Sequence, residues 1–135
     1  MIKLTMLVKR LPNITYEEFD QYWIEHHAPL VASVQNVLNI TRYVQTIPHR
    51  YPKLDKIIQN GRQSQNFVFD GMAEIWWQNL ESMQKNRSSP EAVKALNALM
   101  EDEKHFVNHT QSVVWYATER LIISSNTNYQ TMPLR

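Results

Sequence analysis

Four segments of this chain have the two-residue alternation of a β-strand, and each carries large apolar side chains on both of its faces. The segments span residues 2–8, 38–45, 72–77 and 113–123. In the third segment Trp76 and Trp77 are neighbours, so their side chains point in opposite directions. Exposed apolar surface costs roughly 25 cal/mol per Å². A sheet built from these strands therefore needs a cover on each face.

Two main helices are predicted between the strands, each from a capping signal. One begins near Tyr16, because Thr15 and Glu18 have the spacing of a capping box. The other begins at Pro90, directly after Ser89, with proline in the first helical position. The resulting order β-α-β-β-α-β predicts an α+β domain with a four-stranded antiparallel sheet and both helices on one face.

The helix-free face of such a sheet has no cover within the chain. Large uncovered apolar surfaces mark interfaces, so a homodimer is predicted in which two copies pack sheet against sheet around an apolar chamber. Ile40 and Val44 suit the helix side of the second strand, and the more polar alternate set is expected to face the chamber. The side chains expected in the chamber are Thr5, Leu7, Tyr43, Gln45, Glu74, Trp76 and Tyr116.

The chain's length of 135 residues fits a single domain, predicted here over residues 1–124. Residues 51–66 are polar and aperiodic, and a stretch of that length is predicted to be a functional flap or a locally disordered loop. His49 lies beside it and is expected to close over a ligand, with an ordinary loop histidine as the alternative. The polar residues 125–135 are predicted to form a loose tail.

Composition narrows the classes of function. A formal net charge of +1 argues against a nucleic-acid partner. The chain has no cysteine, which excludes thiolate chemistry, and its two glycines leave no phosphate-binding loop. No apolar run approaches the roughly 18 residues of a membrane span, and no secretory signal is visible at the start. We therefore expect no membrane association and a cytoplasmic location.

The run Tyr-Trp-Ile-Glu-His-His-Ala-Pro-Leu-Val over residues 22–31 resembles the signature of the EthD-like family of dimeric α/β-barrel proteins. Residues 4–10, residues 69–76 and the pair Asp102-Glu103 followed by Phe106 also resemble that family, in the same order. The chain departs from the family pattern at Asn13, where glycine is common, and at Asn108, where an acidic residue is common. Its segment 51–66 is also longer than usual.

The resemblance implies a ferredoxin-like fold, a homodimer and a pocket for a small hydrophobic, aromatic or lactone-like molecule. Relatives include methylmuconolactone isomerases, polyketide cyclases, dehydratases, decarboxylases and an accessory protein of ether degradation; cofactor-free monooxygenases share the fold. The family's recurrent histidine corresponds to His27. No cofactor is implied.

Three residues are predicted to carry chemistry. His27 lies near the expected end of the first helix, where Pro29 ends or kinks it, and is the acid–base candidate; the alternative is a histidine that only caps the helix. Tyr43 would position a substrate oxygen, or else pack as a strand aromatic. Glu74 would be a second titrating group, or else pair with a lysine such as Lys3 or Lys9.

Metal binding is not predicted, and His26 is expected to be a core histidine on the same helix stripe as Phe19 and Trp23. His26 and His27 are adjacent on a helix, so they do not share a face. His105 and His109 have i, i+4 spacing but no acidic residue between them in a metalloprotease pattern.

The leading hypothesis is a cofactor-independent enzyme that uses proton transfer for isomerisation, cyclisation, dehydration or decarboxylation of a small hydrophobic molecule. One alternative is a binding or accessory protein that holds such a molecule. Another is a cofactor-free monooxygenase.

Overall fold

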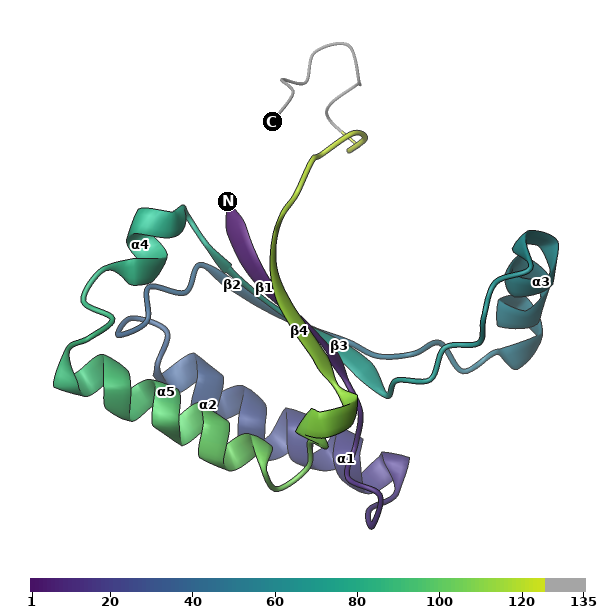
Figure 1. Ribbon diagram of the computed structural model, residues 1–135, viewed down its shortest axis with the longest axis horizontal. Helices are drawn as coiled ribbons and strands as arrows, with labels where there is room; N and C mark the ends of the chain where they lie inside the picture. Colours follow the sequence, from purple (N-terminus) through teal and green to yellow (C-terminus); the bar gives the residue numbers. More distant parts are fainter. Residues whose placement is uncertain (126–135) are drawn as a thin grey trace.

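The computed structural model describes residues 1–125, which form an antiparallel four-stranded sheet with its main helices against one face (Figure 1). The strands are β1 (Ile2–Val8), β2 (Arg42–Thr46), β3 (Gly71–Trp77) and β4 (Val113–Thr118), in the spatial order β2-β3-β1-β4. This confirms the predicted α+β fold. No helix of the described part is both long and apolar enough to cross a membrane, and the cytoplasmic location stays a prediction.

The helical layer consists of one long broken helix and one continuous helix that lie side by side under the sheet (Figure 1). The broken helix comprises α1 (Tyr16–Tyr22), the π-helix η1 (Trp23–His27) and α2 (Ala28–Ser33). The continuous helix is α5 (Pro90–Glu103), and the short helices α4 (Leu80–Gln84) and η2 (His109–Gln111) flank it. Both predicted caps are present, since Thr15 and Glu18 form a reciprocal capping box and Ser89 Oγ accepts from the N–H of Ala92 at 3.1 Å.

A π-helical turn precedes Pro29 in place of the predicted end or kink. The N–H of Ala28 donates to the carbonyl of Trp23, five residues back, and this wider turn accommodates a proline that has no N–H of its own. Because the π-turn contains one residue more than an α-helical turn, the next side chain after Trp23 that points toward the sheet is His27. His26 is therefore exposed and stacks on Tyr22; its predicted place in the core is wrong.

Residues 51–66 are mostly helical, so the predicted irregular flap is wrong. Helix α3 (Pro52–Arg62) begins with Pro52 and ends where Gln63 adopts a left-handed conformation with φ 51°. The helix stands well away from the sheet on two connecting stretches (Figure 1). We call residues 47–69 the arm. Its helical signal is the spacing of Leu54, Ile57 and Ile58, which places three aliphatic side chains on one stripe.

Two strands are shorter than predicted. The second begins at Arg42 rather than at residue 38, because Asn39 takes a left-handed turn with φ 58° just before it. The fourth ends at Thr118, and residues 119–123, which we call the C-terminal segment, continue without strand pairing. Of the predicted tail 125–135, residues 126–135 lie outside the described part of the chain.

The core lies between the helical layer and the sheet, in two clusters. One joins α2 and α5 to the sheet through buried aliphatic residues and Trp77. The other consists of Val8, Phe19, Trp23, Phe106 and Val107. Gly71 is required beside the second cluster, because a Cβ at this position would lie 2.7 Å from the Trp23 ring.

The helix-free face of the sheet is partly covered by charged side chains of the chain itself. Trp76 is only 4% exposed there, since Arg42 and Lys3 lie over its ring and Glu119 accepts a hydrogen bond from its indole N–H. Lys3 also pairs with Glu74 at the centre of this face. Exposed apolar side chains remain along β4, including Val113 and Trp115.

Candidate active site

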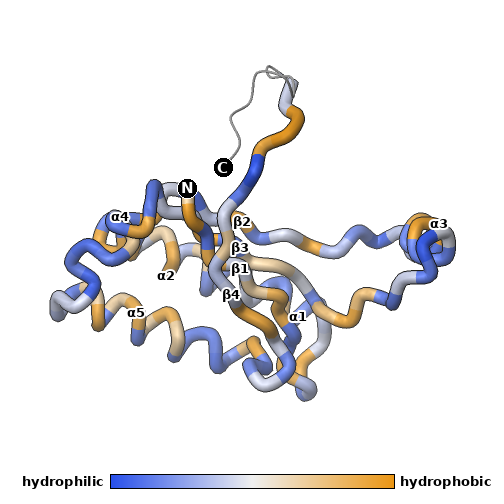
Figure 2. The backbone as a smooth tube through the Cα atoms, turned by 45° about the horizontal axis from the view of Figure 1, so that its top comes forward, coloured by the Kyte–Doolittle hydropathy of each residue, from blue (hydrophilic) through white to orange (hydrophobic). Residues whose placement is uncertain are grey.

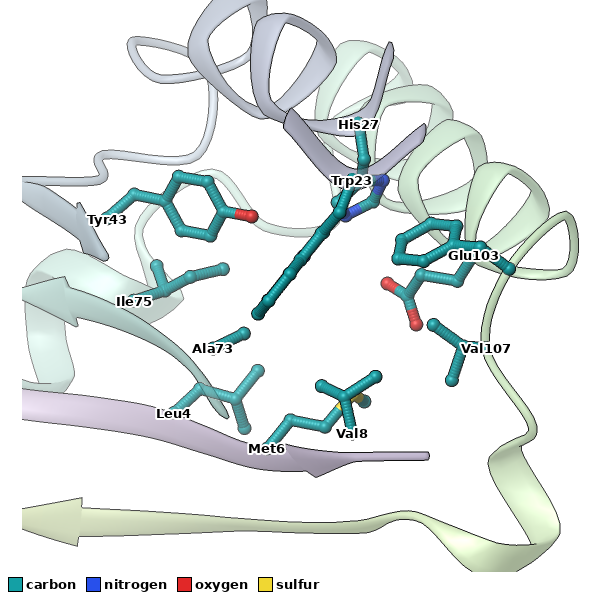
Figure 3. A pocket seen from close by; sticks show the side chains of 11 residues that line it. Leu4, Met6, Val8, Trp23, His27, Tyr43, Ala73, Ile75, Glu103 and Val107 are labelled. Atoms are coloured by element: carbon teal, nitrogen blue, oxygen red, sulfur yellow. The ribbon is translucent and has the colours of Figure 1, made fainter. Parts of the chain in front are cut away.

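A cavity lies between the helical layer and the sheet, at the junction of η1, the end of α5 and three strands (Figure 3). Its free space is about 60 Å³, which is room for a few water molecules. The lining residues are Leu4, Met6, Val8, Trp23, His27, Tyr43, Ala73, Ile75, Glu103, Phe106 and Val107. The cavity is therefore on the opposite side of the sheet from the predicted chamber.

His27 is held in this cavity by a carboxylate. Its side chain is buried, and Nδ1 lies 2.9 Å from Oδ2 of Asp102, at the end of α5. The Phe106 ring packs against the imidazole, with the ring centroids 5.1 Å apart. An ionised carboxylate only accepts hydrogen bonds, so Nδ1 carries the proton and donates it to Asp102. The neutral imidazole then keeps its lone pair on Nε2, as a general base requires.

Asp102 is in turn oriented by Tyr22, whose hydroxyl donates to Oδ1 at 2.6 Å. Burial alone would raise the pKa of Asp102, but the hydrogen bonds from Tyr22 and His27 hold it below its usual value. Burial and the bond to Asp102 raise the pKa of Tyr22 to about 12. The tyrosine therefore stays a donor and the aspartate an acceptor at neutral pH, which fixes the direction of both hydrogen bonds.

We expect the lowered pKa of Asp102 to make stability depend on pH. Its folded-state pKa lies below the usual value of 3.8, so its stabilisation is fully present above that value and is lost as pH falls through the folded-state pKa. Urea denaturation of the wild type and Asp102→Asn, from about pH 6 to about pH 2, should show the difference in unfolding free energy shrinking below about pH 4. A difference that does not change with pH would contradict this assignment.

Tyr43 lies on the helix side of β2 and lines the same cavity. Its hydroxyl accepts a hydrogen bond from Gln45 Nε2 at 2.9 Å, and the same amide also donates to the Trp23 carbonyl at 3.1 Å. Burial raises the pKa of Tyr43, which keeps the phenol protonated. Figure 3 shows the Trp23 indole standing between Tyr43 and Glu103.

Glu103 brings a carboxylate to the lining of the cavity (Figure 3). Its Oε1 lies 2.9 Å from Nε2 of His109 in η2. Neither Glu103 nor Asp102 was singled out for chemistry from the sequence, although both belong to the block that resembles the EthD-like family. Trp23, assigned to the core, also lines the cavity.

The structure brings together only part of the predicted site. His27 and Tyr43 line one cavity, and Gln45 supports Tyr43 from beside it. Glu74 lies on the opposite face of the sheet, where it pairs with Lys3, the structural alternative considered for it. It is therefore not a partner of His27 within this chain.

The remaining predicted substrate-binding residues lie outside the cavity. Thr5, Leu7 and Trp76 share the helix-free face with Glu74, because they are in register on neighbouring strands. Tyr116 is on the helix side of β4 opposite Leu4, but it is half exposed and does not reach the cavity. His49 is exposed at the base of the arm and packs against Tyr51. Within residues 1–125, no three His, Asp or Glu side chains are grouped to hold a metal ion.

The sheet order, the helices on one face and the buried histidine define a ferredoxin-like α+β domain with an internal polar site. Residues 11–110 match the EthD domain, and the chain belongs to this family. Comparison with curated protein sequences gives no match.

Several solved structures share the fold at low sequence identity. An EthD (ethyl tert-butyl ether D) family protein from Bacillus halodurans matches with a TM-score of 0.60 and 19% identity, over 89% of this chain and 99% of that one. A protein from Arabidopsis thaliana matches with a TM-score of 0.54 and 10% identity, over 92% and 100%. A dimeric protein of unknown function from Bacteroides fragilis gives 0.51 and 10%, over 86% and 93%.

Proposed function

We propose that the protein is a cofactor-independent enzyme that acts on a small hydrophobic molecule, aromatic, polyketide-like or lactone, by proton transfer. One observation carries the proposal: a buried histidine lines a mostly apolar cavity, and its Nδ1 lies 2.9 Å from a carboxylate oxygen of Asp102. This contact favours the tautomer that leaves Nε2 without a proton. A histidine that only stabilised the helix end would bond a backbone carbonyl, whereas His27 bonds a distant side chain.

The cavity residues suggest how a proton would move. His27 Nε2 accepts a proton from an acidic carbon of the substrate, and Asp102 stabilises the imidazolium that forms. The Tyr43 hydroxyl donates a hydrogen bond to the oxygen on which negative charge develops. Return of the proton to another carbon gives isomerisation, and transfer to a leaving hydroxyl gives dehydration.

The small free space has a consequence for binding. About 60 Å³ is too little for an aromatic or lactone ligand, so the ligand enters only if side chains move. Trp23 is the largest side chain in the cavity lining, and its indole crosses the middle of the space (Figure 3). Displacement of this ring is therefore the step that we expect to open the site.

We further propose that two copies pair through their helix-free sheet faces. Exposed Val113 and Trp115 on this face support the pairing, as does the dimeric state stated for the Bacteroides fragilis protein. Light scattering should give twice the protomer mass; a single protomer mass at working concentration would exclude the pairing.

Deuterium exchange tests the proposed chemistry. Native mass spectrometry of freshly purified protein identifies a co-purified ligand, which is then incubated with the enzyme in D₂O. We expect deuterium to enter the ligand or its product with wild-type protein and not with His27→Ala, while His27→Ala still binds the ligand. Binding without exchange in the wild type would favour an accessory protein instead, and oxygen consumption during turnover would favour a monooxygenase.

A further inference from the structure

The arm carries an apolar surface that nothing in the described chain covers. On α3, Leu54, Ile57 and Ile58 are all more than half exposed, and Ile57 reaches 67%. Phe67 and Val68, on the returning stretch, are also exposed. A helix of 11 residues is marginal in water on its own. Because α3 buries no residue against its own domain, we expect it to pack against a partner.

A groove beneath the arm continues onto the helix-free face of the sheet. It is lined on the arm side by Pro48, Ile58 and Phe67, and on the sheet side by Leu7 and Met72. Its volume is about 340 Å³, and most of its lining is apolar. The groove therefore extends the face through which two copies are proposed to pair.

The C-terminal segment is a second apolar element that the other described residues leave uncovered. Leu121, Ile122 and Ile123 are exposed, and Ile123 reaches 79%. They form a hydrophobic stretch beyond the end of β4, separate from the sheet and from the arm (Figure 2). Three consecutive exposed aliphatic residues match the apolar lining of the groove in chemical character.

The arm and the C-terminal segment lie at diagonally opposite corners of the sheet. The arm joins β2 to β3 at the end where Val8 pairs with Gly71. The C-terminal segment leaves β4 at the other end, where Ile2 pairs with Thr118. β2 and β4 are also the two edge strands. The arm and the C-terminal segment therefore lie apart within one chain (Figure 1).

We infer that each arm docks on the second copy of this chain, with residues 121–123 of that copy seated in the groove beneath the arm. Consider two sheets that face each other across a twofold axis, with the axis parallel to the sheets and perpendicular to the diagonal through these two corners. Rotation about this axis brings each arm to the other copy's C-terminal segment. The two contacts form together, because the same axis generates both.

The size of the interface supports this arrangement. With strands of five to seven residues, the sheet face covers roughly 20 by 19 Å, or about 400 Å² in projection. A stable pair usually buries about 800 Å² on each partner. Charged Lys3, Arg42 and Glu74 occupy part of the face, so contacts by the arm and the C-terminal segment would add apolar area to the interface.

Cross-linking tests the contact directly, because the chain contains no cysteine. Ile57→Cys and Leu121→Cys are made in separate chains with different tags, co-expressed, purified as the mixed pair and treated with a short bismaleimide. We expect a covalent pair from the mixed sample and little from either variant alone. Ile24→Cys is the matched control: it is 57% exposed on the broken helix, and with Leu121→Cys it should give no covalent pair.

The docking of the arm rests on the sheet-to-sheet pairing proposed above. The results of the experiment show separately whether the docking or the pairing fails. A twofold mass with no cross-link in the mixed sample would overturn the docking of the arm and leave the pairing intact. A cross-link with Ile57→Cys alone would show that arm meets arm, and would also overturn it. A single-protomer mass would exclude both. Ile57→Asp gives an independent measurement: we expect at least a tenfold rise in the dimer dissociation constant, and no change with Ile24→Asp.

Discussion

Asp102→Asn should lower turnover by about 10²- to 10⁴-fold with little loss of ligand affinity. Tyr22 donates to Oδ1 of this side chain, so an asparagine would orient its carbonyl oxygen toward Tyr22 and its amide NH₂ toward His27. The NH₂ group only donates, which forces Nδ1 of the neutral imidazole to accept and moves the ring proton to Nε2. The cavity-facing nitrogen would then be a donor and could not accept a proton from a substrate.

Nitrogen NMR of the His27 ring measures this change without a substrate. At alkaline pH we expect the proton on Nδ1 in the wild type and on Nε2 in Asp102→Asn. Adding Tyr22→Phe removes the donor that fixes the asparagine, so its amide can turn its oxygen to His27. The double variant should therefore regain the Nδ1 tautomer and part of the activity. Identical tautomers in the wild type and Asp102→Asn would refute the role given to Asp102.

The fold could be predicted because its signals are local. Thr15 with Glu18 and Ser89 with Pro90 mark helix starts within four residues of sequence, and strand alternation needs only neighbouring residues. The prediction for the arm is wrong because its helix gives only a weak local signal. The helix has one short apolar stripe and no buried residue. Because most residues of the segment are polar, the spacing of Leu54, Ile57 and Ile58 does not stand out.

The alternation of strand residues could not predict which side chains face the helices. Alternation separates Tyr43 and Gln45 from Val44, but it does not say which set faces the helices. Polarity suggested that Tyr43 and Gln45 point away from the helices. The helical layer itself contains a polar site, and Gln45 satisfies both the Trp23 carbonyl and the Tyr43 hydroxyl there. Val44 consequently faces away from the helices, contrary to the prediction.

The candidate site depends on two features that a regular helical repeat does not reveal. The π-turn exchanges the positions of His26 and His27, so a regular helical repeat assigns the wrong histidine to the inner stripe. Asp102 contacts His27, which is 75 positions away in the sequence. Nothing in the sequence of its own helix distinguishes Asp102 from the other polar residues there. Resemblance to a known family indicated His27, whereas only the three-dimensional structure connects it to Asp102 and Tyr22.

Phe19→Ala should lower the free energy of unfolding by about 3–5 kcal/mol. The Phe19 side chain is completely buried, and its ring centroid lies 5.2 Å from the Trp23 ring centroid and 5.6 Å from the Phe106 ring centroid. Truncation removes contacts to both rings and leaves a cavity between α1, η1, the residues that follow α5, and the sheet. The stability of a whole domain is typically only about 5–15 kcal/mol, so this single change is expected to remove a large share of it.

Urea denaturation and thermal melting measure the effect, with a midpoint shift of roughly 10–18 °C expected for a chain of this length. Ile24→Ala is the control on the same broken helix, because Ile24 is exposed and its loss should cost less than about 0.5 kcal/mol. Since Trp23 and Phe106 also line the cavity, Phe19→Ala should loosen the walls around His27 as well. A stability within about 1 kcal/mol of the wild type would mean that these rings are not the support on which the candidate site is built.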